Sequence, residues 1–251
     1  MIHFDTIGKG AQTAWILHGI LGSGRNWRSF ARQLAKQHPD WRFVLPDLRN
    51  HGQTGPLPGP HRLSDCADDL QALPAPDWVM GHSFGGKVAM EWARSHGTDQ
   101  SVWVLDSVPF ADRSGDSEVL GVLGALDATT PPVPERRDLR QQLEDQGLQG
   151  FLIDWLLTSA TETDAGWTWV YDLAAVRTML TSYFTTDFSA DLDDWSGTSL
   201  HIVRAAKSDR WRPEWVEKLE QNTRVDFQTL PDAGHWLHVD NPKGLLEMLH
   251  P

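Results

Sequence analysis

One strand-to-helix junction restricts the possible folds more than any other part of the sequence. Trp78 to Met80 form a short apolar run typical of a buried strand, and Gly-His-Ser-Phe-Gly follows at residues 81–85. An apolar pattern at helical spacing, from Val88 to Ala93, comes next. Side chains at the two glycines would collide with neighbouring backbone, and Ser83 must adopt a strained conformation. The junction predicts a serine held on a sharp turn at the end of a buried strand.

Strands and helices alternate on both sides of this junction. Amphipathic helical patterns separate the apolar runs, which is typical of a parallel sheet covered on both faces. The predicted strands lie at residues 13–17, 42–46, 78–80, 102–105, 200–203 and 225–227.

The alternation stops after Pro109 and resumes at Leu200. Residues 111–195, called the insertion below, read as loop and helices. We therefore expect a single domain over residues 1–251. The α/β core spans 1–110 and 196–251 and contains a doubly wound, mostly parallel sheet. A helical lid at about 111–195 is inserted between two of the strands.

Composition excludes several classes of partner. The chain has 251 residues and a formal net charge of −12, so phosphate backbones and anionic lipids would repel it. We expect neither nucleic acid nor a membrane as a partner. Cys66 is the only cysteine, which excludes an internal disulfide. Residues 1–10 hold no apolar stretch of signal-peptide length, and no window approaches about 18 apolar residues, so we expect a cytoplasmic location.

A serine hydroxyl is a weak nucleophile until a base takes its proton. Of the 11 histidines, His235 comes directly after the last predicted strand. Functional loops of doubly wound sheets gather at the carboxyl ends of the strands, where Ser83 also lies. His235 is therefore the predicted base. Four other histidines are interpreted as structural groups: His18, His51, His82 and His238.

The oxyanion formed by nucleophilic attack needs backbone N–H donors. One is predicted to be Phe84, directly after the nucleophile. The second should come from the loop after the first core strand, where Ile20 is the candidate and Leu21 the alternative. Their apolar side chains would also form part of the pocket wall.

Four segments of the chain, which contain the candidate residues, resemble a known family. They resemble the YbfF-like esterases of the α/β-hydrolase superfamily, which are related to the mammalian abhydrolase-domain-11 branch. The resemblance implies an α/β-hydrolase fold and an esterase acting on short- to medium-chain esters or thioesters, with no cofactor and no metal. The segments are His18–Ser23, Asp47–Gly52, Gly81–Lys87 and Ala233–Trp236.

Two aspartates are candidates for the carboxylate that orients His235. Asp209, in the loop after the strand that follows the insertion, has the spacing commonest in the superfamily. In the YbfF-like branch that loop tends to carry a serine, as Ser208 does here, and an aspartate one strand earlier takes the role. Asp106 matches that position and is preferred, while Asp209 stays open as the alternative.

Aromatic residues are dense in the insertion and are predicted to form an apolar pocket. We expect at least two of six to line a cavity over Ser83, and the substrate-pocket residues are predicted to be Trp155, Trp167, Tyr183 and Phe184. Phe151 and Trp169 complete the six. The expected partner is a small-molecule ester, and the expected assembly is a monomer or a small homo-oligomer.

Two other functions stay open. The first and third motifs also resemble SHCHC synthase, the menaquinone-pathway lyase that eliminates pyruvate. A carbon–carbon lyase or hydrolase of that type would need cationic groups in the insertion to hold a carboxylated substrate. The second alternative is a hydrolase-fold protein that only binds a small ligand. The available cations are Arg136, Arg137, Arg140 and Arg177.

Overall fold

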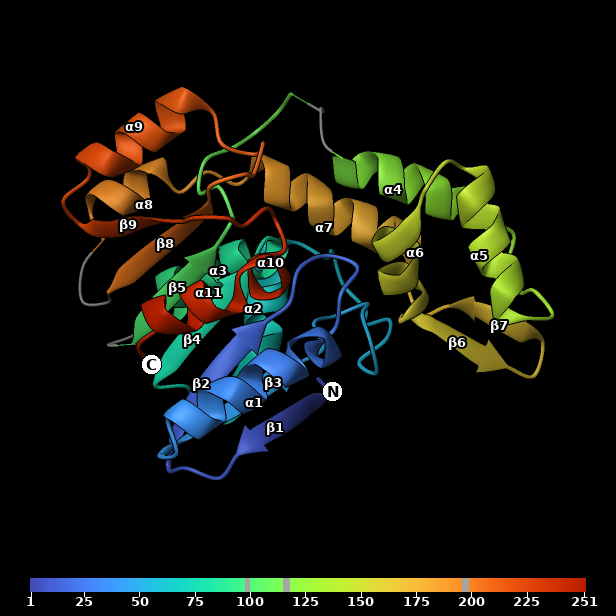
Figure 1. Ribbon diagram of the computed structural model, residues 1–251, viewed down its shortest axis with the longest axis horizontal. Helices are drawn as coiled ribbons and strands as arrows, with labels where there is room; N and C mark the ends of the chain where they lie inside the picture. Colours follow the sequence, from blue (N-terminus) through green and yellow to red (C-terminus); the bar gives the residue numbers. More distant parts are fainter. Residues whose placement is uncertain (98–99, 115–117, 196–198) are drawn as a thin grey trace.

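The computed structural model describes residues 1–97, 100–114, 118–195 and 199–251. Within them, the central sheet has seven strands in the order β1-β3-β2-β4-β5-β8-β9 (Figure 1). Every neighbouring pair is parallel except β1 with β3, which is antiparallel. The strands are β1 (Phe4–Gly8), β2 (Gln12–Leu17), β3 (Trp41–Pro46), β4 (Trp78–His82), β5 (Ser101–Leu105), β8 (Leu200–Ala205) and β9 (Val225–Leu230).

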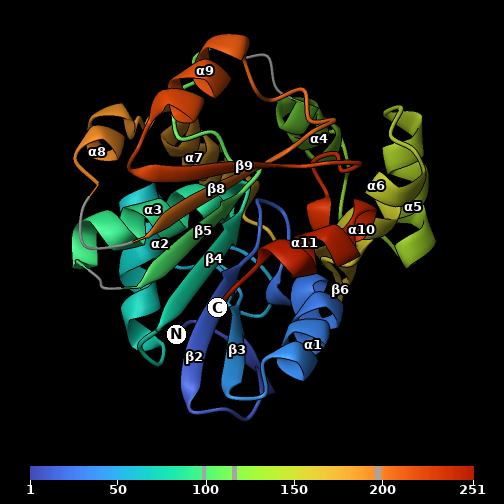
Figure 2. The ribbon, with the colours of Figure 1, turned by 60° about the vertical axis from the view of Figure 1, so that its left-hand side comes forward.

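Helices cover both faces of the sheet, as the alternating pattern predicts (Figure 2). Successive strand side chains point to opposite faces, so Trp15 and Leu17 pack on one side and Ile16 on the other. The first face is covered by α2 (Leu63–Asp69), η2 (Leu70–Ala72), α3 (Phe84–His96) and α9 (Pro213–Gln221). The second is covered by η1 (Gly24–Trp27), α1 (Arg28–Gln37), α10 (Leu237–Asp240) and α11 (Pro242–Met248).

Two elements differ from the sequence prediction. Strand β1 was not predicted, because its residues alternate between exposed and half-buried positions instead of forming an apolar run. The prediction that the insertion holds only loop and helices was wrong at β6 (Ala160–Thr163) and β7 (Gly166–Trp169), which pair as an antiparallel hairpin. Thr and Trp favour strands, and Gly166 adopts a φ of +120° that suits the turn.

The insertion lies between β5 and β8 and extends beyond the carboxyl ends of the strands (Figure 1). The predicted core boundary at residue 196 lies outside the described residues. The two ends of the insertion are bonded together: Asp112 N–H donates to the Phe184 carbonyl, and Phe188 N–H donates to the Pro109 carbonyl, both at 2.9 Å. Its helices are α4 (Glu118–Asp127), α5 (Arg136–Asp145), α6 (Gly150–Leu157), α7 (Leu173–Thr185) and α8 (Ser189–Asp193).

A buried lysine ties the insertion to the core. Lys87, on α3, is only 1% exposed. Its Nζ donates to the carbonyl oxygens of Phe110 (2.9 Å), Tyr183 (2.8 Å) and Thr186 (2.8 Å). Burial lowers the pKa of Lys87 to about 7. Two of these bonds satisfy carbonyls at the C-terminal end of α7, so this end is bonded directly to the helix that follows Ser83.

Candidate active site

Ser83 lies on the turn between β4 and α3, with φ 53° and ψ −119°. Two glycines make this turn possible. A Cβ on Gly81 would lie 2.0 Å from the Gly85 carbonyl oxygen, and one on Gly85 would lie 2.6 Å from the carbonyl oxygens of Leu17 and His18. No larger residue fits without moving backbone, which is why the sequence has glycine at both positions.

Asp106 and His235 come together at the same edge of the sheet. Asp106 follows β5 and is fully buried, and His235 lies in the loop after β9. His235 Nδ1 lies 2.7 Å from Asp106 Oδ2. Because a carboxylate only accepts hydrogen bonds, Nδ1 carries the proton and Nε2 is left free to accept one. The structure therefore brings the Asp106 carboxylate within hydrogen-bond distance of the His235 ring.

Further donors hold Asp106 as a carboxylate. Its oxygens accept from Ala205 N–H (3.0 Å), Ser208 Oγ (2.7 Å) and Trp211 Nε1 (2.7 Å). Burial alone would raise the pKa of Asp106. The hydrogen bond and charge of His235, with the bonds from Trp211 and Ala205, lower that pKa to about 2.

Asp209, the alternative acid, lies elsewhere. It is exposed and lines a neighbouring second pocket, and among the described residues it forms no hydrogen bond with His235. Ser208, beside it in the chain, bonds to Asp106 instead. The geometry brings Asp106 rather than Asp209 to the imidazole.

Burial lowers the pKa of His235 from its ordinary value, although the hydrogen bond to Asp106 raises it and the charge of Arg210 lowers it further. His235 is therefore neutral at neutral pH and able to accept a proton. The His82 ring donates from Nε2 to the His235 carbonyl at 2.7 Å, which fixes the backbone of the loop. A structural role for His82 stays a prediction.

The loop after β2 distinguishes the two candidate oxyanion donors. Leu21 N–H donates to His51 Nε2 at 2.9 Å, so it is already engaged. Burial lowers the pKa of His51 to about 3, which keeps that nitrogen an acceptor. For Ile20 N–H, no partner is found within the described part of the chain. Phe84 is the first residue of α3, where a backbone N–H has no partner within its helix. Ile20 and Phe84 stay the predicted pair.

Sequence reasoning missed a contact that joins this loop to the insertion. The Tyr171 hydroxyl, just before α7, donates to the Leu21 carbonyl at 2.5 Å, and the tyrosine ring packs edge-on against His51. Leu21 has a φ of 61°, an uncommon conformation for a branched side chain, and these contacts hold it there. No motif surrounds Tyr171, so its partner could not be recognised from the sequence.

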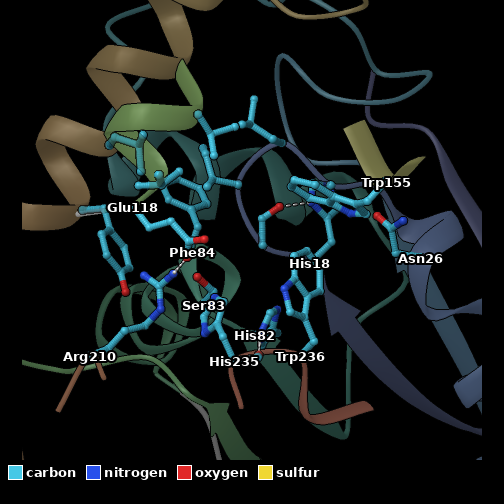
Figure 3. A pocket seen from close by; sticks show the side chains of 18 of the residues that line it. His18, Asn26, His82, Ser83, Phe84, Glu118, Trp155, Arg210, His235 and Trp236 are labelled. Atoms are coloured by element: carbon cyan, nitrogen blue, oxygen red, sulfur yellow. Dashed lines mark hydrogen bonds and ion pairs between the residues drawn. The ribbon is translucent and has the colours of Figure 1, made fainter. Parts of the chain in front are cut away.

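A pocket opens directly over Ser83 (Figure 3). Ser83, Phe84, Ile20 and His235 line it on the core side. The insertion contributes mostly apolar walls: Val119, Val122, Leu152, Trp155, Leu180, Tyr183 and Phe184.

Three of the six insertion aromatics line this pocket, namely Trp155, Tyr183 and Phe184. Trp167 is not among the lining residues and is corrected as a pocket residue. It lies on β7, where its backbone pairs with Val133, so the hairpin that the sequence did not reveal holds it elsewhere. Trp169 is buried with its indole N–H on Thr129, and Phe151 is 54% exposed.

The four arginines considered for a carboxylated substrate are bonded away from the pocket. None of them is among its lining residues, which include Arg210 instead. Arg136 donates to the Leu157 carbonyl, Arg137 pairs with Glu135, Arg140 with Asp154 and Arg177 with Asp127.

The described residues hold neither a metal-binding cluster nor a membrane-spanning helix. They contain no cluster of three or more His, Cys, Asp or Glu side chains arranged to hold a metal ion. None of the helices in these residues has both the length and the apolar character needed to cross a bilayer.

A mostly parallel sheet with a serine on a strained strand-to-helix turn, and with a histidine–aspartate pair at the same edge, is the architecture of the α/β hydrolases. The chain matches the alpha/beta hydrolase family over residues 16–248 and belongs to it.

Relatives within this family cover most of the chain. An sn-1-specific diacylglycerol lipase of Mus musculus is 27% identical over 243 residues, which make up 92% of this chain and 77% of that protein. Esterase YbfF of Escherichia coli (strain K12) is 24% identical over 246 residues, covering 93% of this chain and 90% of the esterase. A solved structure of a marine microorganism esterase shares the fold, with a TM-score of 0.86 at 24% identity, over 98% of this chain and 97% of the other.

Proposed function

We propose that this chain is a carboxylic ester hydrolase with Ser83 as its nucleophile. The observation that carries the proposal is the 2.7 Å bond between His235 Nδ1 and Asp106 Oδ2, formed beside the pocket that Ser83 and His235 share. This bond fixes the tautomer in which Nε2 can take the serine proton. The names of the two relatives, a lipase and an esterase, support the same class of reaction.

In the proposed reaction, His235 Nε2 takes the proton of Ser83 Oγ as the oxygen attacks the ester carbonyl. The negative charge on the carbonyl oxygen is stabilised by the N–H groups of Phe84 and Ile20. The tetrahedral intermediate collapses, and the alcohol leaves with the proton that His235 held. Water then attacks the acyl-enzyme with His235 again as base, which releases the acid and restores Ser83.

The insertion acts in this proposal as a lid. Its apolar and aromatic side chains form the wall opposite Ser83, which favours apolar acyl chains of short to medium length and excludes water. Lys87 and Tyr171 attach it to the core beside the nucleophile and the oxyanion loop. The chain is thus one domain in which the core supplies the chemistry and the insertion selects the substrate.

A chain-length series of p-nitrophenyl esters tests this function. We expect turnover that is fastest with short to medium acyl chains and requires no added metal or cofactor. The menaquinone-precursor elimination, run beside it, should give no product. Elimination without ester hydrolysis would assign the protein to the lyase alternative, and ligand binding without any turnover would assign it to the binding-protein alternative.

The activity should persist into mildly acidic solution. Burial lowers the pKa of His235, so the imidazole stays neutral to a lower pH than an exposed histidine does. As pH falls, kcat/KM should decline through a midpoint below about 6.5, the ordinary histidine value. A pH profile of kcat/KM on one p-nitrophenyl ester measures this midpoint. A midpoint above 7 would contradict the assignment of burial as the dominant effect.

A further inference from the structure

Arg210 lies in the loop between β8 and α9, at the boundary between two pockets. It lines the pocket over Ser83 and also the second pocket, together with Glu118, Tyr183 and Phe184. No sequence motif surrounds it. Its guanidinium lies in the pocket that Ser83 and His235 also line, where it forms an ion pair with Glu118 (Figure 3).

This guanidinium lacks a close partner. Its ion pair among the described residues is with Glu118, at 3.9 Å, which is too long for a hydrogen bond. The Arg210 side chain is 22% exposed, whereas Glu118 is 78% exposed. Arg210 Nε is buried and has no hydrogen-bond partner among the residues that the structure describes. Because a mostly buried charge whose ion pair is this long is costly, the site is suited to a closer anion that the protein does not itself supply.

The other charged groups of the second pocket do not fill this role. Lys87 already donates to three carbonyl oxygens, and Arg212 forms a 2.5 Å pair with Asp112. Asp209 also lines the second pocket but is not within ion-pair distance of Arg210. Among the described cations that line the two pockets, Arg210 is the one left available to a ligand.

We propose that Arg210 binds a carboxylate of the substrate, so that the preferred esters carry a carboxyl group besides the ester that is cleaved. The carboxylate would replace Glu118, the first residue of α4, and accept hydrogen bonds from the planar guanidinium. This inference rests on the proposed ester hydrolysis and deepens it by naming the substrate class.

A bound carboxylate would also assist the chemistry. The charge of Arg210 lowers the pKa of His235 and so opposes formation of the imidazolium. An anion paired with Arg210 offsets that charge when His235 takes the serine proton. Neutral esters lack this compensation, so the preference should appear in kcat/KM rather than in binding alone.

The test compares esters that differ only in this charge. One arm uses p-nitrophenyl monoesters of succinic, glutaric and adipic acid against the matching monoamides, which place the carboxyl group in the acyl part. The other arm uses carboxyphenyl butyrate against carbamoylphenyl butyrate, which places it in the alcohol part. In at least one arm the wild type should prefer the carboxylate by roughly 10- to 100-fold in kcat/KM, as expected for a charged hydrogen-bonded pair.

Three variants distinguish carboxylate binding by Arg210 from a general effect of the protein's charge. Arg210→Gln should bring the carboxylate-to-amide ratio close to one, mainly by raising KM for the carboxylate. Arg177→Gln removes the same charge from an arginine paired with Asp127 outside the pocket, and it should leave the ratio unchanged. Glu118→Gln removes the competing carboxylate and should increase the preference.

A wild-type carboxylate-to-amide ratio of kcat/KM at or below one in both arms overturns the proposal. An Arg210→Gln variant that loses kcat/KM equally on the carboxylate and on the amide of each pair overturns it as well. Ester hydrolysis itself would survive either result, since the monoamides report it separately. Calorimetry of free glutarate with Ser83→Ala protein gives a readout without turnover. Glutarate should bind to the Ser83→Ala protein, and adding Arg210→Gln to that protein should abolish the binding. If Ser83→Ala does not bind glutarate and the wild-type carboxylate-to-amide ratio is one, the proposal is wrong.

Discussion

Ser83→Ala is expected to abolish ester turnover, with kcat falling by about 10⁶-fold, as in serine hydrolases that lose the nucleophile. The reason is chemical: alanine offers no oxygen to attack the carbonyl, and only oxyanion stabilisation and binding remain. The substitution removes one hydroxyl from a tightly built turn, so the fold should be unchanged. Measurement of kcat on a p-nitrophenyl ester, beside a thermal melt, checks both statements.

Covalent labelling gives an independent measurement. A fluorophosphonate probe should modify the wild-type protein at Ser83, and peptide mass spectrometry should locate the adduct. Ser95→Ala is the matched control, because Ser95 lies on the same helix and bonds to Glu91, away from the pocket. It should keep both turnover and labelling. Labelling that persists in Ser83→Ala would assign the nucleophile to another residue.

Asp106→Asn is expected to lower kcat by about 10⁴-fold at neutral pH with little change in KM, as in the serine-protease case. Without the carboxylate, the His235 ring is no longer held with its proton on Nδ1, and the imidazolium loses its counter-charge. The asparagine amide would also face the donors Ser208 Oγ and Trp211 Nε1, which now bond to the carboxylate. A thermal melt of the variant is therefore needed beside its kinetics.

Asp209→Asn is the matched control for this prediction. The Asp209 side chain is exposed and lines the second pocket, so its neutralisation should cost far less in kcat. The opposite ranking would give the orienting role to Asp209. Equal losses would show that the two carboxylates share the imidazole. A folded Asp106→Asn protein with near wild-type kcat would remove Asp106 from the mechanism altogether.

The sequence predicts the core of this fold well because its strongest constraints are local. Gly81 and Gly85 have no substitute at their positions, and the apolar runs of β2 to β5 are the mark of strands buried on both faces. Strand β1 and the β6–β7 hairpin escape prediction because their residues are mostly half-buried or exposed and form no continuous apolar run. Their positions follow from the strands they pair with, which a local pattern does not contain.

The residues of the candidate site also differ in how far a local sequence pattern predicts them. Ser83 and His235 stand in recognisable motifs, whereas Asp106 and Asp209 both follow strands at one edge of the sheet and differ only in where their side chains point. That difference depends on Trp211 and Ala205, which hold Asp106 in place. Arg210 has no local signature at all, because its environment is created by Glu118, distant in the chain.

The backbone bonds at the base of the insertion make its length independent of the sheet. Because the Asp112–Phe184 and Phe188–Pro109 bonds bring its ends together, residues can be added or lost between them without shifting a strand of the sheet. A change in the length of the insertion can therefore leave Ser83, Asp106 and His235 in their positions at the edge of the sheet. What must be retained is small: carbonyls for Lys87 and a donor for the Leu21 carbonyl. The fold thus separates a sheet whose geometry must be kept from an insertion whose length is free to vary.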